Sequence, residues 1–195
     1  VGRLIGDRPV LNVCGELNAI AHHEHDFTGG LNRGVFGAAY YGSALIGLMR
    51  GGADLEMRWT ATSKYWHGRE DAYGLLSKDG VPTPAALAKQ VFAQHVRHGD
   101  SIRFPVLDRA LSGVDCVIAR NAAGRTSAIL VNTQARSCKV ELSALDPGIP
   151  PGGDLRRLDQ GTGGEVCRSK LGADVSIEGY GLAVISDDAH TTDIG

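Results

Sequence analysis

The chain has 195 residues and a net charge of −2, and 43% of its residues are hydrophobic and 22% charged. This composition is typical of a folded protein of one large or two small domains, and it excludes a disordered chain. The small net charge gives no electrostatic reason to bind nucleic acid or an anionic membrane, so we expect neither partner. Glycine is in excess at 27 residues, about twice its ordinary share of roughly 7%, which predicts many turns.

The first half of the chain, residues 9–98, alternates between strand and helix patterns. Thr83 precedes Pro84 at the start of the second helix, a typical capping pair, and Asn32 and Gly51 are expected to begin and end the first. This order is the repeating unit of parallel α/β folds. The expected elements are a buried strand over 9–14, a helix over 32–50, a strand over 54–60, a loop over 61–80 and a helix from residue 84.

The longest uncharged stretch is residues 34–49, inside the first expected helix. At 16 residues it is shorter than the ~20 that cross a bilayer, so we predict a buried helix. The first seven residues lack the apolar core of a secretory signal. Localisation stays open, with a lean towards a secreted or periplasmic protein.

From residue 101 onward, short β-rich runs recur between Gly, Pro, Asn and Asp turns. Residues 121–124 are expected to form a hairpin turn between two of them. Many short strands with such turns predict an antiparallel β-sandwich. We therefore divide the chain into residues 1–98 and 99–195. The expected strands are 102–107, 114–120, 127–132, 138–142, 155–158 and 182–185.

Cysteine spacing gives no metal or redox motif. No two cysteines stand in a C-x-x-C pattern, which argues against zinc and thioredoxin-like sites. A disulfide between Cys138 and Cys167 and a set of buried free thiols are both compatible with the sequence. The four cysteines are Cys14, Cys116, Cys138 and Cys167.

Glu16 comes at the end of the first expected strand. Side chains alternate along a strand, so Leu11 and Val13 would face the helices while Cys14 and Glu16 would face the interior of a parallel barrel. A carboxylate at the C-terminal end of a barrel strand is positioned for catalysis. A structural ion pair at the rim is an equal alternative on this evidence alone. By the same alternation, Glu56 and Arg58 would form an inward-facing structural ion pair.

Four short motifs resemble clan A retaining glycoside hydrolases, most closely family 39, the β-xylosidase and α-L-iduronidase type. Residues 15–18 (GELN) look like the T-E-W-N that carries the nucleophile, and residues 58–60 (RWT) resemble the Y-W-T of the eighth barrel strand. Residues 73–76 (YGLL) resemble G-F-G-L-L. Residues 80–84 (GVPTP) resemble the G-I-P-K-P that leads into the last barrel helix. All four follow in the family's order.

The resemblance implies the C-terminal part of a (β/α)8 barrel, comprising its last two strand–helix units, followed by a β-sandwich. It implies hydrolysis of O-glycosyl bonds in a β-linked or uronic glycan by double displacement, with Glu16 as the nucleophile and no cofactor. The family's acid/base Glu follows an Asn, and residues 1–195 contain no Asn-Glu pair. A missing N-terminal barrel segment or a second chain would have to supply that group and cover the barrel edges.

The resemblance also suggests which residues contact the carbohydrate. Asn18 belongs to the nucleophile motif, and Trp59 corresponds to the tryptophan that forms the floor of the sugar site, where the next peptide is often cis. Tyr65, Trp66 and His67 follow in the loop on the catalytic side, where aromatic rings stack on sugars. A core role for Trp59 and plain loop packing for the other three are the structural alternatives.

Other functions have weaker support. The cluster at residues 22–26 (HHEHD) lacks the spacing of a rigid zinc site, so we expect no metal. Residues 161–164 (GTGG) are read as a turn, since no strand–loop–helix context or following lysine indicates a phosphate loop. The main alternative to a hydrolase is a non-catalytic carbohydrate-binding or structural module, and an Asn-Glu strand end upstream in the gene would separate the two. An α/β hydrolase ranks last because G-x-S-x-G is absent.

Overall fold

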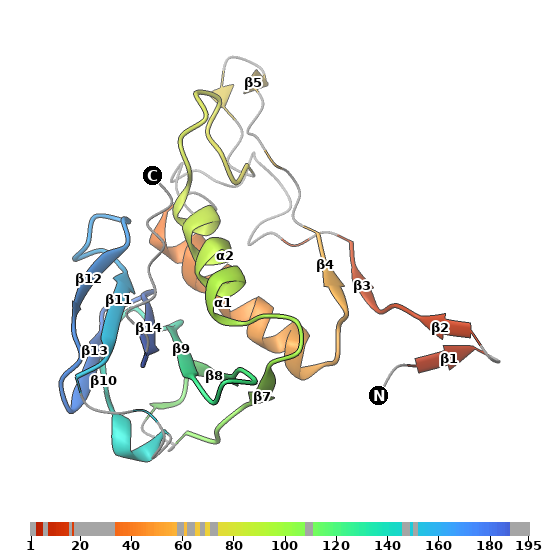
Figure 1. Cartoon of the computed structure of the whole chain (residues 1–195). Coiled ribbons are helices and arrows are strands. Elements are labelled where there is room, and N and C mark those ends of the chain that lie inside the picture. The colour runs from red at the N-terminus through yellow and green to blue at the C-terminus, as the bar shows by residue number, and fades with distance from the viewer. Residues whose placement is uncertain are drawn as a thin grey trace.

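A computed structural model describes residues 3–5, 8–15, 17, 34–57, 61, 65–66, 69–70, 74–107, 111–145, 149 and 152–187 (Figure 1). In chain order the elements are β1 (Arg3–Ile5), β2 (Arg8–Val10), β3 (Val13–Cys14), α1 (Val35–Arg50), β4 (Leu55–Glu56), β5 (Tyr65–Trp66), β6 (Arg69–Glu70), α2 (Pro84–His95), β7 (Ser101–Arg103), β8 (Val114–Arg120), β9 (Thr126–Asn132), β10 (Cys138–Glu141), the 3-10 helix η3 (Leu142–Ala144), β11 (Asp154–Leu158), β12 (Cys167–Lys170), β13 (Asp174–Ile177) and β14 (Leu182–Ser186).

The first half contains a parallel strand pair joined by a helix. β3 and β4 pair in parallel, with Val13 beside Leu55 and Cys14 beside Glu56, and α1 connects them. The predicted β-α-β-α order is therefore confirmed. The strands are shorter than expected, because residues 8–10 pair with β1 in an antiparallel hairpin instead of extending β3.

Helix α1 begins later than the sequence suggested. Its N-cap is Gly34, which has no side chain to bond the first turn, and the expected cap Asn32 lies outside the described residues. The helix ends where predicted, with Gly51 donating its N–H to Gly47 O at 2.9 Å. Gly52 follows with φ +74°, a backbone conformation that favours glycine. In the described part of the chain, neither helix combines the length and apolar character needed to cross a membrane.

Thr83 fixes the start of α2, as predicted. Its hydroxyl accepts a hydrogen bond from the N–H of Ala86 at 3.4 Å and donates to Leu75 O at 2.9 Å. Thr83 is also only 6% exposed. It therefore caps the helix and anchors the preceding loop at the same time.

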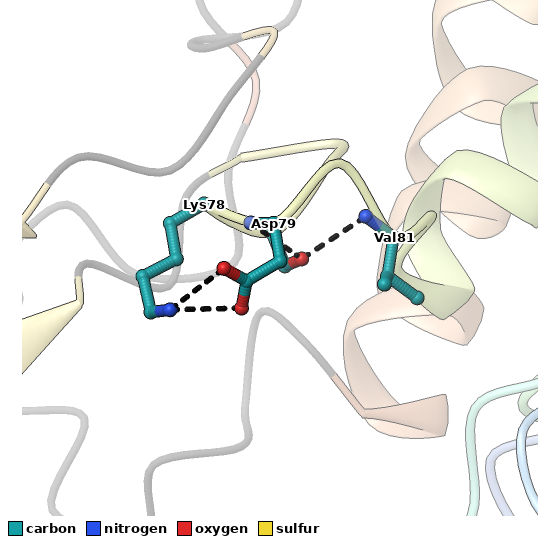
Figure 2. Close-up of polar contacts among 4 residues, drawn as sticks. Lys78, Asp79 and Val81 are labelled. Carbon is teal, nitrogen blue, oxygen red and sulfur yellow. Dashed lines mark hydrogen bonds and ion pairs between the residues drawn. The ribbon is translucent and has the colours of Figure 1, made fainter.

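The turn before Thr83 is closed by its own side chains (Figure 2). Ser77 Oγ accepts hydrogen bonds from the backbone N–H groups of Asp79 and Val81, at 3.3 and 3.1 Å. Lys78 Nζ lies 2.8 Å from both carboxylate oxygens of Asp79, and Gly80 has φ +79°. These local bonds shape the turn at residues 77–81, ahead of the buried Thr83.

The second half forms a six-stranded antiparallel sheet in the order β12-β11-β14-β9-β8-β7, beside a two-stranded antiparallel sheet of β10 and β13. The turn between β8 and β9 is confirmed, with Gly124 N–H bonded to Asn121 O at 2.9 Å. The sequence did not reveal β12, whose residues are all exposed at the sheet edge, or β13.

The central strands of the six-stranded sheet are buried on both faces, which gives the described part of the molecule two cores (Figure 1). One face packs against α1 and α2, and the other packs against β10, β13 and the segment around η3. The helix-facing core, which we call the helix–sheet core, contains Ala38, Ala39, Tyr41, Ile46, Ala88, Val91, Phe92, Val117, Ile129, Val131, Leu158, Leu182 and Val184.

The part of the chain that the structure describes is thus a mixed α and β structure, mostly sheet, with two α-helices. The complete barrel and the β-sandwich go beyond what is described and stay predictions. The expected domain boundary at residues 98 and 99 falls between α2 and β7, and it stays a prediction too.

All four cysteines are free, so Cys138 and Cys167 form no disulfide. Cys116 is the one that lies in the core, on β8, and its side chain is almost completely buried. Burial raises the pKa of the Cys116 thiol to about 12, while nearby Arg50 lowers it and Asp115 raises it by smaller amounts.

Candidate functional site

The parallel pair β3–β4 places two long connections at one end of the molecule. Residues 15–34 lead from β3 to α1, and residues 57–83 lead from β4 to α2. Both leave the C-terminal ends of parallel strands, the end at which barrel enzymes carry their catalytic groups. The candidate site is therefore this end of the β3–β4 pair.

Most of the predicted site residues belong to these two connections. Glu16, Asn18, Trp59 and His67 lie outside the described residues, and so does the Trp59–Thr60 peptide. Tyr65 and Trp66 form the short strand β5, which pairs with β6 in an antiparallel hairpin. The expected loop over 61–80 thus contains a hairpin at its outer end (Figure 1).

Glu56, the last residue of β4, forms polar contacts with both helices. Its Oε2 accepts a hydrogen bond from Tyr41 Oη on α1 at 2.8 Å and lies 2.9 Å from Lys89 Nζ on α2. The Glu56 side chain is only 11% exposed. The carboxylate therefore joins β4 to both helices and lies on the helix side of the strand. The expected inward orientation of Glu56 is wrong, and its partner Arg58 lies outside the described residues.

The orientation predicted for the β3 segment is also wrong. Leu11 and Val13 were expected to pack against the helices, but they are 69% and 43% exposed. Cys14 is the residue beside Glu56 in the parallel pair, and neighbours in a pair share one face of a sheet. Cys14 therefore lies on the helix side and Val13 on the open side. Apolar residues also line the open side of β4, where Leu55 and Met57 are about half exposed.

Leu17, three residues after Cys14, packs against the helix–sheet core. Regular alternation puts residues 14 and 17 on opposite faces. Both lie on the helix side, because β3 ends at Cys14 and strand alternation does not continue to Leu17. Gly15, the next residue after Cys14, has open space where a Cβ would stand.

No group of three or more His, Cys, Asp or Glu side chains among the described residues is arranged to hold a metal ion. The cluster at residues 22–26 lies outside them.

No protein-family model matches the chain, and no curated protein matches it by sequence. Solved structures do match by fold. A family 30 endoxylanase from Clostridium papyrosolvens has a TM-score of 0.57 at 9% identity, over 91% of this chain and 42% of that one. A family 30 subfamily 8 xylanase from Clostridium acetobutylicum has a TM-score of 0.61 at 10% identity, over 93% and 46%.

An arabinose-bound family 51 α-L-arabinofuranosidase has a TM-score of 0.63 at 16% identity, over 92% of this chain and 32% of that one. The chain thus spans less than half the length of these structures. Family 39 itself is not specifically supported. At the level of the clan, the fold of this chain is similar to the C-terminal, β-rich part of glycoside hydrolases.

Proposed function

We propose that this chain is the C-terminal part of a retaining glycoside hydrolase in which Glu16 is the nucleophile. The helix-side position of Leu17, directly after Glu16 in the chain, carries this proposal. Leu17 packs on the helix side, so the preceding residue in an extended chain points the opposite way. Glu16 would then face the barrel interior, as predicted. Strand alternation continued from Cys14 would instead point it towards the helices, so the reasoning behind the prediction was wrong. Gly15, which has open space where a Cβ would stand, would allow the chain to take this orientation.

Trp59 would lie on the same face. Glu56 faces the helices while Leu55 and Met57 lie on the open side, so alternation along β4 directs odd-numbered residues to that side. The open face of β3–β4 would be the interior wall of the complete barrel. Its exposed leucines, valine and methionine support this, because interior positions of such barrels are filled with bulky apolar side chains.

The reaction needs a second carboxyl group. A retaining enzyme holds its two carboxyl groups ~5–5.5 Å apart, so that one attacks the anomeric carbon while the other protonates the leaving oxygen. In the proposed enzyme the second group comes from the remaining barrel strands, on a preceding segment or a second chain. The oxygen–anomeric carbon bond to Glu16 forms as the glycosidic bond breaks, and water then hydrolyses the ester.

The names of the matched structures suggest which substrates to test first. Two are named as xylanases and one as an α-L-arabinofuranosidase, and these names refer to the pentoses xylose and arabinose. We therefore propose a pentose-containing glycan as substrate, with Tyr65 and Trp66 at the rim and Asn18 and His67 in its contacts.

The test is carried out on the polypeptide that contains this chain together with the remaining barrel strands. A 2-fluoro xyloside or arabinofuranoside with a good leaving group should label the peptide that contains Glu16, as read by mass spectrometry. Glu16→Gln should lower turnover of aryl glycosides by roughly a thousandfold or more. The matched control is Asp79→Asn, which changes an exposed carboxylate in the loop after β4 and should keep full activity.

Labelling of another carboxylate, or full activity in Glu16→Gln, would overturn the assignment. Binding of glycan without any turnover in the complete protein would favour the non-catalytic carbohydrate-binding module instead.

A further inference from the structure

The turn between β11 and β12, residues 159–166, lies against the first residues of both helices. A Cβ added to Gly164 in this turn would lie 3.3 Å from Pro84 Cγ and 3.8 Å from Val35 Cγ1. Val35 begins α1 and Pro84 begins α2, so both follow directly on the two connections that leave the candidate site. The six-stranded sheet therefore touches both helices at the points where these connections end.

Tyr180 makes a second contact of this kind from the turn between β13 and β14, residues 178–181. Its ring lies edge-on to the ring of Phe36, the second residue of α1, with the centroids 5.0 Å apart and the planes at 69°. Both side chains are half-buried, and Tyr180 packs against the helix–sheet core. Aromatic pairs in this arrangement attract each other beyond the effect of the area they bury.

Hydrogen bonds hold both turns firmly. Residues 161–164 form a turn, as predicted, and the buried Asp159 carboxylate accepts the N–H of Thr162 there at 2.9 Å. In the other turn, Tyr180 donates its N–H to Gln134 O at 2.9 Å. The two turns therefore present their contacts to the helices in fixed positions.

The backbone of Tyr180 indicates that its ring is important. Tyr180 has φ +54°, and it is the one non-glycine residue with a positive φ in the described part of the chain. This conformation is unfavourable for a bulky side chain, whereas glycine and asparagine adopt it more readily. Such a conformation persists where surrounding contacts hold it, and the contact with Phe36 is one of them.

Helix α1 connects this contact to the candidate site. Tyr41, five residues after Phe36, donates its hydroxyl to Glu56 Oε2 at 2.8 Å. Glu56 ends β4 and pairs with Cys14, which stands two residues before the proposed nucleophile. Chains of packed and hydrogen-bonded side chains of this kind can couple distant positions.

We infer that Tyr180 is a positioning residue of the proposed enzyme. Its ring fixes the start of α1, and α1 in turn fixes the ends of β3 and β4, which Glu16 and Trp59 follow in the chain. The strands after α2 thus contribute to the rate of the reaction as well as to stability. This inference rests on the proposed function.

The experiment compares three variants of the polypeptide that contains this chain together with the remaining barrel strands. Tyr180→Asn removes the ring and suits the backbone conformation, so the turn is kept. Tyr180→Phe keeps the ring. Val96→Ala is the matched control, because Val96 packs against the same helix–sheet core but at the other end of α2.

Amide hydrogen exchange and steady-state kinetics are measured on each variant. In Tyr180→Asn we expect exchange to accelerate roughly tenfold at Ala38, bonded in the first turn of α1, and at Met57, which bonds β4 to β3. We expect kcat on aryl glycosides to fall roughly tenfold with KM nearly unchanged, because a displaced nucleophile slows the chemical step more than it weakens binding. Tyr180→Phe and Val96→Ala should keep these exchange rates and kcat.

The inference is overturned if Tyr180→Asn leaves exchange or kcat unchanged, or if Val96→Ala has the same effects, which would indicate general destabilisation. Exchange does not depend on turnover, so it tests the contact between Tyr180 and α1 even in an inactive polypeptide. If exchange accelerates as expected but Glu16 is not labelled by the 2-fluoro glycoside, the proposed function alone is overturned and the contact stands.

Discussion

The thiol groups of Cys116 and Cys167 lie in opposite surroundings. Cys116 is buried in the core with its pKa raised to about 12, and Cys167 is exposed on the edge strand β12. Only the thiolate reacts readily with alkylating agents. The two positions therefore predict very different reactivity within one folded molecule.

We expect iodoacetamide at pH 8 to label Cys167 in the folded chain and to label Cys116 only after urea unfolding, as read by peptide mass spectrometry. Unfolding returns the Cys116 pKa to its ordinary value of 9.0. Below pH 9 the thiol is protonated in both states, so its contribution to stability is complete. That contribution declines as the pH rises towards about 12, because only the unfolded state gains by ionising. Equal labelling of both cysteines in the folded chain would contradict this account.

Glu56 offers a second residue-level prediction. Glu56→Gln removes the charge that Lys89 faces but keeps an oxygen for the Tyr41 hydroxyl. We expect a loss of about 1 kcal/mol in the free energy of unfolding, measured by urea denaturation, because the Glu56 carboxylate is only 11% exposed while the Lys89 side chain is 39% exposed. The exposed pair of Lys78 and Asp79 provides the control, since Asp79→Asn should cost at most about 0.5 kcal/mol. A similar small loss in both variants would show that the Glu56 contacts contribute little.

Helix α1 contains two glycines, Gly42 and Gly47, in different surroundings. Gly42 faces the sheet, and a Cβ there would meet Val131 Cγ2 at 3.1 Å and Leu182 Cδ1 at 3.2 Å. Gly47 has nothing within 4 Å of the same position. The first glycine permits close packing of helix on sheet, and the second has no such role.

The two glycines therefore predict opposite effects within one helix. Gly42→Ala should lower stability by about 1–3 kcal/mol through overpacking. Gly47→Ala should raise it by up to about 1 kcal/mol through helix propensity. Thermal and urea unfolding of the two variants, compared with the unchanged chain, measure both. If Gly42→Ala proves as stabilising as Gly47→Ala, the helix and the sheet are farther apart than described.

The elements that the sequence predicted well are those with strong local signals. Thr83 and Pro84 determine the start of α2, Gly51 ends α1, and β8 and β9 follow from their β-rich runs and the Asn121 turn. These features depend on a few neighbouring residues. Their physical cause lies within one or two turns of chain, so the sequence alone reveals them.

Features that depend on partners distant in the chain were not predictable. Whether Val13 faces the helices or the open side depends on the residues around it in the fold. The local sequence does not decide between the two, because one side of the strand has apolar residues and the other has a cysteine. The edge strand β12 is polar and exposed, and only its pairing with β11 makes it a strand. The contact between Tyr180 and Phe36 joins the β13–β14 turn to α1, and no motif links the two residues.

At the scale of the whole molecule, the open face of β3–β4 is an exposed apolar surface among the described residues. Leu11, Val13, Leu55 and Met57 are all at least 43% exposed on it. A parallel pair with apolar side chains and open edges tends to associate with other chains. In the proposed enzyme the remaining barrel strands cover this face.

The isolated chain should therefore self-associate, and Leu55→Gln should reduce that association in sedimentation velocity. Val106→Gln is the matched control, because Val106 is 99% exposed but lies far along the chain beside β7. Its replacement should leave the sedimentation profile unchanged. A monomeric chain that binds no hydrophobic dye would show that the apolar face is covered from within.

The double-sided burial of the six-stranded sheet has a consequence for how such proteins evolve. Strands β9 and β14 contribute side chains to both cores, so the buried faces of α1 and α2 pack against this sheet. A gene rearrangement that moved the sheet into another protein without these helices would expose their apolar faces to water. We therefore expect this sheet to be inherited together with α1 and α2, and not as a separate module carried on a linker.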